Sequence, residues 1–387
     1  MSDLKPSDLL DLDALLSDEE RQIRDLAREW VHDRILPEVE DWYERGEFPA
    51  RELAKELGEL GFFGMQLEGI GDLGAVAYGL VELELEAGDS GLRSFVSVQS
   101  ALAMYAIHAF GSDEQKAHWL PRMASGDAIG CFGLSEPDSG SDPSSMRTTA
   151  RRDRADWIVN GTKMWITNGG VSDVAVVWAN TDDGIRGFLV PCDLPGFSAP
   201  DIHKKMSLRA SVTSELVMDD VRLPADAVLP GVEGLRGPLS CLNEARYGIV
   251  WGVMGAARTC FETALTYSKE RMQFDKPIAS FQLTQKKLAD MAIELTKGTL
   301  LAYHLGRMKE DGRLQAEQVS IGKLNNTREA IAIARTSRGI LGANGITLEY
   351  PIMRHMTNLE SVLTYEGTEE VHTLVIGQVL TGIRAFT

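Results

Sequence analysis

The sequence predicts a multidomain α+β protein in which helical regions flank a region of short strands. Apolar residues recur at helical spacing in the first third of the chain, and short runs rich in branched residues replace them between Asp127 and Pro230. Long helical patterns return from Gly237 onward. Because helices and strands are segregated and do not alternate, a doubly wound parallel sheet is excluded for the chain as a whole.

Length and composition agree with this class. A chain of 387 residues with 44% hydrophobic residues is long enough for two or three domains. The formal charge of -18, with no basic block to offset it, argues against a nucleic-acid-binding surface. The 4 cysteines and 7 histidines lack CxxC and HxxxH spacing, so neither a metal site nor a disulfide framework is indicated.

The first region, residues 1–126, is expected to be an α-helical domain. Its amino terminus has neither the apolar core of a signal peptide nor an arginine-rich transit pattern, and the chain has no apolar run long enough to cross a membrane, so we expect a cytoplasmic protein. Ser17 and Glu20 form a capping-box pattern at the start of a helix. Further helices are expected at about 50–60, 73–87, 92–110 and 113–124.

A glycine motif in this region offers a different interpretation. Gly69–Gly74 matches the dinucleotide-binding pattern GxGxxG, which would favour a nicotinamide-dependent dehydrogenase. That fold needs continued alternation of strand and helix, and the motif is followed by a long helical run. We therefore predict a glycine-rich turn between two helices.

The second region, residues 127–236, is expected to form an antiparallel sheet domain. Runs such as Ala175–Trp178, Gly187–Val190 and Glu215–Met218 are separated by Gly, Asp, Asn and Pro. The third region, residues 237–387, is expected to form a four-helix bundle, because its helical patterns are broken by short turns near residues 275, 311, 345 and 366.

The last of these breaks holds the best candidate for a catalytic residue. Gly367 allows the backbone to turn, and Thr368 is a suitable N-cap for the next helix. Glu366 therefore projects from a corner where a pocket can form. The alternative is that Glu366 is only a solvated residue at a helix end.

A second candidate is Arg93, which lies in an otherwise apolar helical stretch. In a helix, Arg93, Ser97 and Ser100 share one face, where a guanidinium beside hydroxyl groups can hold a carboxylate. The alternative is an arginine that pairs with Glu86 or Asp89 at a helix start.

Two segments of the middle region, Gly130–Asp142 and Lys163–Asn168, resemble the acyl-CoA dehydrogenase family. They supply hydroxyl groups, amide N–H groups and an aromatic wall, Trp165, which suit a flavin. The resemblance runs from about residue 10 to Thr387 and is closest to the decarboxylating glutaryl-CoA dehydrogenases. It implies an amino-terminal helical domain, a middle β-barrel and a carboxyl-terminal four-helix bundle. It also implies FAD bound across a subunit boundary of a homotetramer.

The resemblance also implies roles for single residues. Glu366 matches the catalytic base, and the matching substrate contacts are Arg93, Ser94, Ser141, Asn243, Arg246, Gly367, Glu86 and Tyr365. The matching FAD contacts are Phe132, Leu134, Ser135, Ser141, Trp165, Ile166, Thr167, Arg271, Phe274, Gln282, Gly339, Ile340, Leu341, Gly342, Ala343, Thr368 and Phe386. The 339–343 segment is expected from a neighbouring subunit.

The implied reaction has two stages. Glutaryl-CoA is first oxidised between its α- and β-carbons, and the product then loses CO2 to give crotonyl-CoA, while electrons pass to an electron-transferring flavoprotein. Other activities on the same fold are a short- or branched-chain acyl-CoA dehydrogenase and an acyl-CoA oxidase. A non-catalytic flavin or acyl-CoA binding protein is the most distant alternative.

Overall fold

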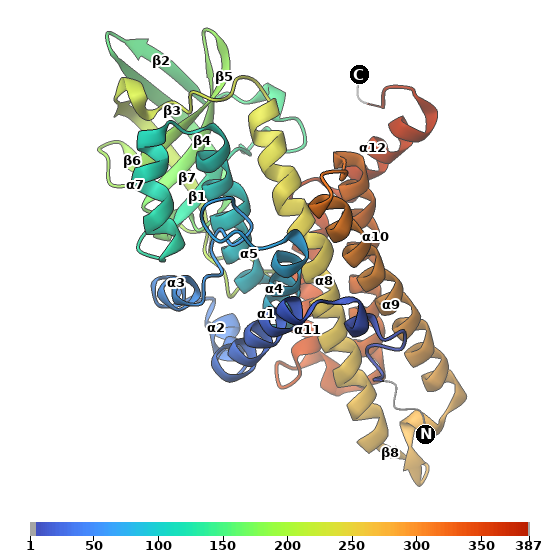
Figure 1. The fold of residues 1–387 in the computed structure, drawn as a ribbon. Helices are drawn as coiled ribbons and strands as arrows, with labels where there is room; N and C mark the ends of the chain where they lie inside the picture. Colours follow the sequence, from blue (N-terminus) through green and yellow to red (C-terminus); the bar gives the residue numbers. More distant parts are fainter. Residues whose placement is uncertain (1–4, 386–387) are drawn as a thin grey trace.

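The computed structural model describes residues 5–385, and its amino-terminal third is helical (Figure 1). The Ser17 capping box is confirmed, with Ser17 Oγ accepting from Glu20 N at 3.2 Å. The predicted helix at 92–110 consists of α5 and α6 joined by a π-helical segment, Val98–Met104. The helices of this part are α1 (Asp18–Trp30), α2 (Val39–Arg45), α3 (Ala50–Glu59), α4 (Ala75–Gly88), α5 (Ser90–Ser97), α6 (Tyr105–Phe110) and α7 (Asp113–Ala124).

The glycine motif at Gly69–Gly74 lies in the connection between α3 and α4, with no strand on either side in the described chain. The interpretation as a turn between helices is therefore confirmed.

The middle of the chain forms a curled seven-stranded sheet with the order β1-β4-β2-β3-β7-β6, and β5 pairs with β4. Most pairs are antiparallel, as predicted, but β1 and β2 each run parallel to β4. A register shift in the β3–β7 pair falls between Lys163 and Ile166, so the bulge displaces Met164 and Trp165. The strands are β1 (Gly130–Gly133), β2 (Thr149–Asp153), β3 (Asp156–Thr167), β4 (Val174–Thr181), β5 (Gly184–Pro191), β6 (Phe197–Ser198) and β7 (Thr213–Leu223).

Long helices fill the carboxyl-terminal part. Four of them pack together as predicted, and a fifth, α12, follows the break at residues 365–368 and extends from the end of this group (Figure 1). A short hairpin joins the first two helices. These elements are α8 (Arg236–Glu270), β8 (Met272–Gln273), β9 (Lys276–Pro277), α9 (Gln282–Glu310), α10 (Ala316–Ile340), α11 (Pro351–Thr364) and α12 (Glu369–Thr381).

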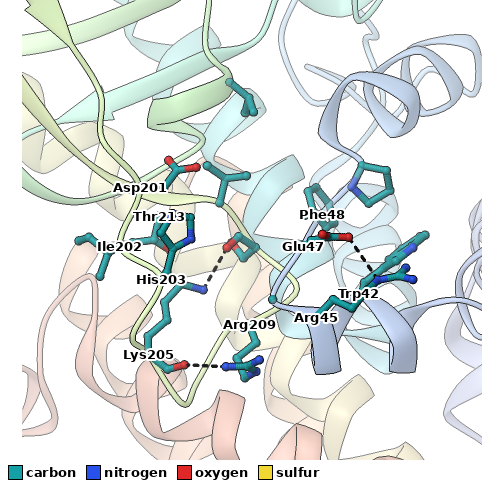
Figure 2. A pocket seen from close by; sticks show the side chains of 15 residues that line it. Trp42, Arg45, Glu47, Phe48, Asp201, Ile202, His203, Lys205, Arg209 and Thr213 are labelled. Carbon is teal, nitrogen blue, oxygen red and sulfur yellow. Dashed lines mark hydrogen bonds and ion pairs between the residues drawn. The ribbon is translucent and has the colours of Figure 1, made fainter.

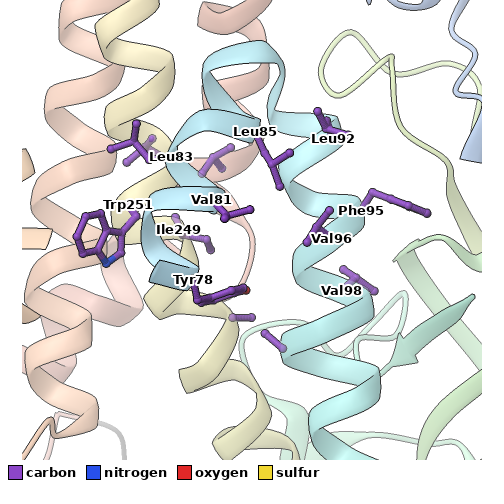
Figure 3. Packing of buried hydrophobic residues seen from close by; sticks show 14 of the residues in the cluster. Tyr78, Val81, Leu83, Leu85, Leu92, Phe95, Val96, Val98, Ile249 and Trp251 are labelled. Atoms are coloured by element: carbon purple, nitrogen blue, oxygen red, sulfur yellow. The ribbon is translucent and has the colours of Figure 1, made fainter. Parts of the chain in front are cut away.

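The main core joins the two helical parts. Helix α4 is buried along its whole length between α5 and α8, and Figure 3 shows Val81 and Leu85 of α4, Val96 of α5 and Ile249 of α8 in this cluster. Because every side chain of α4 is enclosed, a glutamate on it can stay ionised at low cost only with a partner inside the protein. None of the helices in the described residues combines the length and apolar content that a membrane crossing requires.

Candidate active site

Glu366 lies at a corner between α11 and α12. The break and the N-cap are as predicted, since α11 ends at Thr364 and Thr368 Oγ1 accepts from Val371 N at 3.3 Å. Glu366 has a φ of 53°, in the left-handed region that a non-glycine residue rarely occupies. Such backbone strain persists only where the surroundings hold it, and it is common at functional sites.

Two cations hold this corner through its main-chain carbonyl groups. Arg246 Nε donates to the Glu366 oxygen at 2.6 Å, and Lys323 Nζ donates to the oxygens of Tyr365 at 2.7 Å and Gly367 at 2.6 Å. Arg246 also donates to Asn243 Oδ1 at 3.4 Å. Three consecutive carbonyl groups are thus fixed, which accounts for the unusual backbone at Glu366.

The carboxyl group of Glu366 remains available for chemistry. Its Oε2 is buried and has no hydrogen-bond partner among residues 5–385. Burial raises the pKa of Glu366, and the positive charges of Arg93, Lys323 and Arg246 oppose this rise. A buried carboxyl group with a raised pKa is a stronger base than a solvated one, so the enclosed Oε2 favours the catalytic interpretation of Glu366 over a solvated residue at a helix end.

Arg93 is fully buried on α5, and its guanidinium makes contacts on two sides. Nε donates to Glu86 Oε2 at 2.7 Å, and Nη2 donates to the hydroxyl group of Tyr365. The same hydroxyl lies 3.2 Å from Ser94 Oγ. The pairing with Glu86 that was the alternative for Arg93 is therefore present. It leaves Nη1 buried with no partner in the part of the chain that the structure describes.

The three residues of the predicted face, Arg93 and Ser97 on α5 and Ser100 in the π-helical segment after it, differ in their environment. Ser100 Oγ accepts from Gly64 N at 3.0 Å and so fixes a loop. Ser97 Oγ is buried and has no partner within residues 5–385. Ser97 follows Arg93 by four residues, so the two lie on the same side of the helix. Only Arg93 and Ser97 are therefore available to a ligand.

Asp89 fixes α5 relative to α11. Its carboxylate accepts from Gly91 N at 2.6 Å at the start of α5, and from Arg354 Nη1 at 2.5 Å and Asn358 Nδ2 at 2.9 Å on α11. Since α5 carries Arg93 and α11 leads to Glu366, this buried contact sets the spacing of the two candidate residues.

The two middle segments predicted to contact FAD lie side by side. Met164 N donates to Ser135 O at 2.9 Å, and Lys163 Nζ donates to Leu134 O at 3.1 Å and Glu136 Oε1 at 2.8 Å. Trp165 is 61% exposed with a φ of 65°, because the bulge turns it out of the sheet. Around it, Phe132, Leu134 and Ile166 are buried, Ser135 and Thr167 are half-buried, and Ser141 is exposed.

A second group of predicted FAD contacts lies far from this one. Phe274, 86% exposed, lies at the tip of the β8–β9 hairpin beyond the end of α8, and Arg271 and Gln282 flank the hairpin. Asn344 Nδ2 donates to Tyr267 Oη at 3.2 Å, which attaches the adjoining 339–343 segment to the same end of α8. The sheet contacts the other end, where a Cβ at Gly237 would lie 2.3 Å from the Trp178 ring (Figure 1).

This separation is larger than one cofactor can bridge within one chain. The 35 residues of α8 extend over about 50 Å at the usual helical rise. The contacts around Trp165 and those around Phe274 are therefore not brought together in a single chain. Thr368 lies at the Glu366 corner, and Phe386 lies outside the described residues.

Several buried polar residues around Glu366 were not predicted. Lys323 is 1% exposed on α10, and burial lowers its pKa to about 7. His372 of α12 lies against the turn, where a Cβ on Gly367 would approach its Nε2 to 2.7 Å. Tyr78 and Glu82 of α4 are also enclosed. The sequence contains one signal for such residues, which is a polar residue on the apolar face of a helix. Lys323 is an example, because it follows Val319 by four residues and so shares its buried face.

An open cavity lies elsewhere. It has a volume of about 530 Å³ and lies between the loop after α2 and the 201–213 segment, as Figure 2 shows with Glu47, His203 and Arg209. None of the predicted site residues lines it. The described residues also contain no group of His, Cys, Asp and Glu suited to a metal ion.

Comparison with known proteins identifies the family. Models of the acyl-CoA dehydrogenase N-terminal, middle and C-terminal domains match residues 17–127, 131–221 and 233–381. The chain belongs to the acyl-CoA dehydrogenase family. A structure of glutaryl-CoA dehydrogenase from Mycobacterium smegmatis is 68% identical to this acyl-CoA dehydrogenase, with a TM-score of 0.98 over 99% of this chain and 100% of the other.

Two other relatives are informative. A glutaryl-CoA dehydrogenase from Mycobacterium smegmatis in complex with FADH2 is 62% identical, with a TM-score of 0.98 and coverage of 99% of this chain and 100% of the other. The short-chain specific acyl-CoA dehydrogenase of Bos taurus mitochondria is 35% identical, over 96% of this chain and 92% of its own. Identity to the two Mycobacterium smegmatis structures is thus much higher than identity to the Bos taurus enzyme.

Proposed function

We propose that this acyl-CoA dehydrogenase oxidises glutaryl-CoA and decarboxylates the product to crotonyl-CoA and CO2. The observation that carries the proposal is the buried Arg93 guanidinium, which has one unused nitrogen and is joined through Tyr365 to the corner that bears Glu366. A guanidinium in this position can bind the distal carboxylate while Glu366 acts on the carbon next to the thioester. The 68% identity to a glutaryl-CoA dehydrogenase supports the same substrate.

The residues near Trp165 fit FAD. The bulge holds a large aromatic ring outside the sheet at a positive φ, beside the half-buried hydroxyl groups of Ser135 and Thr167, so a planar heterocycle finds both a wall and polar partners. We assign Phe132, Leu134, Ser135, Ser141, Trp165, Ile166, Thr167 and Thr368 to this end of the cofactor. When bound, FAD supplies the acceptor for the hydride that leaves the β-carbon.

The protein supplies the base and the anchors. Glu366 removes an α-proton, and its main-chain N–H donates to the thioester oxygen as negative charge develops there. Arg93, with Ser94, Tyr365 and Glu86, holds the distal carboxylate, while Asn243, Arg246, Ser141 and Gly367 contact the thioester side. When CO2 leaves, the electron pair of the broken C–C bond is delocalised onto the thioester. Glu366 then returns its proton to the γ-carbon.

The cofactor site also requires a second subunit. Arg271, Phe274, Gln282 and the segment Gly339, Ile340, Leu341, Gly342 and Ala343 lie at the far end of α8, so we assign them to the cofactor of a neighbouring chain in a homotetramer. Exposed apolar side chains at this end, Phe274 and Leu283 at 86% and 77%, suit burial in such an assembly. The electrons leave one at a time to an electron-transferring flavoprotein.

Product analysis tests this function. Purified enzyme is given glutaryl-CoA or butyryl-CoA with an artificial one-electron acceptor, and the thioesters are identified by mass. We expect faster turnover of glutaryl-CoA with crotonyl-CoA as its product. Equal rates would favour a short-chain enzyme, and glutaconyl-CoA as the final product would remove the decarboxylation step. Peroxide release in air would identify an oxidase.

A further inference from the structure

Another buried acid, Glu82, lies one helical turn before Glu86. Tyr78, Glu82 and Glu86 follow at intervals of four residues and share one face of α4, the helix in which Figure 3 labels Tyr78. On α8, Cβ atoms at Gly248 and Gly252 would lie 3.1 Å from Glu82 Oε2 and 2.2 Å from Glu86 Oε2. The two carboxyl groups therefore lie directly against the α8 main chain.

The two acids differ in their partners. Glu86 accepts from Arg93 Nε at 2.7 Å and from Ser90 Oγ at 2.8 Å. Both carboxyl oxygens of Glu82 are buried and have no partner within the described chain. Because an unpaired carboxylate is very costly away from water, a group in this position takes up a proton. Burial raises the pKa of Glu82 to about 8. Arg93 and the neighbouring Tyr78 hydroxyl oppose this rise, and the charges of Glu86 and Glu366 add to it.

Tyr78, Arg93 and Glu366 all influence the Glu82 carboxyl group, and each has an unsatisfied buried atom. The Tyr78 hydroxyl, Arg93 Nη1, Ser97 Oγ and Glu366 Oε2 are all buried without a partner in residues 5–385. Buried donors and acceptors that the protein leaves unpaired are normally satisfied by water or a ligand. The free nitrogen of Arg93 selects a ligand with a carboxylate, and Glu82 adds a group that can donate to the same carboxylate only when it is protonated.

The charges around this cluster favour a neutral Glu82. The charged and titratable groups that face the cluster are Tyr78, Glu82 and Glu86 of α4, Arg93 of α5, Glu244 and Arg246 of α8, Lys323 of α10, and Tyr365 and Glu366 of the α11–α12 turn. A substrate carboxylate would join the carboxylates of Glu86 and Glu366 beside Arg93. An ionised Glu82 would add like charge and compete for the same guanidinium.

We propose that Glu82 binds the substrate as a carboxylic acid, donating a hydrogen bond to the distal carboxylate of glutaryl-CoA beside Arg93 Nη1. Ionisation of Glu82 then ends this interaction and replaces it with repulsion. The inference rests on the proposed function, which it extends by one specificity-determining residue. A substrate without a distal carboxylate gains nothing from the proton on Glu82.

A ratio of two rate constants tests the proposal: kcat/KM for glutaryl-CoA divided by kcat/KM for butyryl-CoA, measured from about pH 6 to about pH 10. Ionisations that change the turnover of both substrates equally cancel in this ratio. In the wild type we expect the ratio to be constant at low pH and to fall about tenfold per pH unit above the ionisation of Glu82. Glu82→Gln keeps the shape and a donor but cannot ionise. Its ratio should stay constant, within about threefold of the wild-type value at low pH. Glu59→Gln, an exposed change on α3, should keep the wild-type profile.

A second measurement does not depend on turnover. The infrared spectrum of the wild type at neutral pH should contain the C=O stretch of a protonated carboxyl group, and Glu82→Gln should lack it. A wild-type ratio independent of pH, an unchanged alkaline fall in Glu82→Gln, or a missing carboxyl band would each overturn the role of Glu82. Absence of glutaryl-CoA turnover by the wild type at every pH would instead overturn the proposed function.

Discussion

Arg246 binds Glu366 through the main chain and not through the carboxylate. Its Nε atom donates to the Glu366 carbonyl oxygen at 2.6 Å, while Glu366 Oε2 has no partner among the described residues. A cation on the carboxylate itself would compete for the electron pair that removes a proton. The arrangement fixes the position of the acid and leaves one carboxyl oxygen free.

Replacing Glu366 by glutamine tests its role as the base. Glu366→Gln keeps the size of the side chain but cannot accept the α-proton, so kcat should fall by about 10²- to 10⁴-fold. Absorbance spectra should show the same cofactor content as the wild type. Turnover within about threefold of the wild type would contradict the role assigned to Glu366.

Replacing Arg93 tests substrate choice. Arg93→Met should reduce kcat/KM for glutaryl-CoA much more than for butyryl-CoA, because only the first has a distal carboxylate. The change also leaves Glu86 buried without its ion pair, which typically costs about 3–5 kcal/mol of stability. The double variant Glu86→Gln/Arg93→Met should recover much of that stability in urea unfolding but none of the preference. Equal losses for both substrates would contradict the role of Arg93.

The pH dependence of stability is a separate test of the environment of Glu82. Its pKa is raised from 4.5 to about 8 on folding, so the folded protein binds more protons than the unfolded chain between these values. The stability that this group contributes is fully present below the unfolded pKa and is lost as pH rises through the folded pKa. The wild type should therefore lose on the order of a few kcal/mol relative to Glu82→Gln between about pH 5 and pH 8. If the difference in the free energy of unfolding between the wild type and Glu82→Gln were the same at both pH values, a buried neutral Glu82 would be excluded.

Hybrid oligomers test whether two chains build each cofactor site. Trp165→Ala and Phe274→Ala should each lower FAD content when expressed alone. If the two residues reach one cofactor from different chains, some cofactor sites in a random hybrid combine an unchanged Trp165 with an unchanged Phe274. About one cofactor site in four should then be intact. Flavin content of purified, doubly tagged hybrids measures this. Hybrids with no more flavin than their parents would mean that both residues act in the same chain.

The sequence predicted the elements well where the signal was local. The helix break at Glu366 and the capping box at Ser17 depend on a few adjacent residues, and both formed as expected. Trp165 was predicted as a wall, but its exposure depends on a bulge that requires the pairing of β3 with β7. A bulge of this kind has no clear local signal.

The partners of buried charges could not be predicted in the same way. Three glutamates of α4 alternate with apolar residues, yet each has a different environment: Glu84 pairs with Arg28 and Arg258, Glu86 with Arg93, and Glu82 with none in the described chain. These partners are up to 174 residues away in the sequence. A lysine in a helix is usually exposed, so Lys323 gave little reason to expect a buried role.

The glycines of α8 have a consequence for which changes this enzyme tolerates. A methyl group at Gly252 would come within 2.2 Å of Glu86 Oε2, so Gly252→Ala must displace the carboxylate that orients Arg93. A change that adds no charge and touches no substrate would then disturb the ion pair that positions Arg93. Substitutions that impair this enzyme should therefore occur at glycines of α8 such as Gly252, as well as at residues with functional side chains.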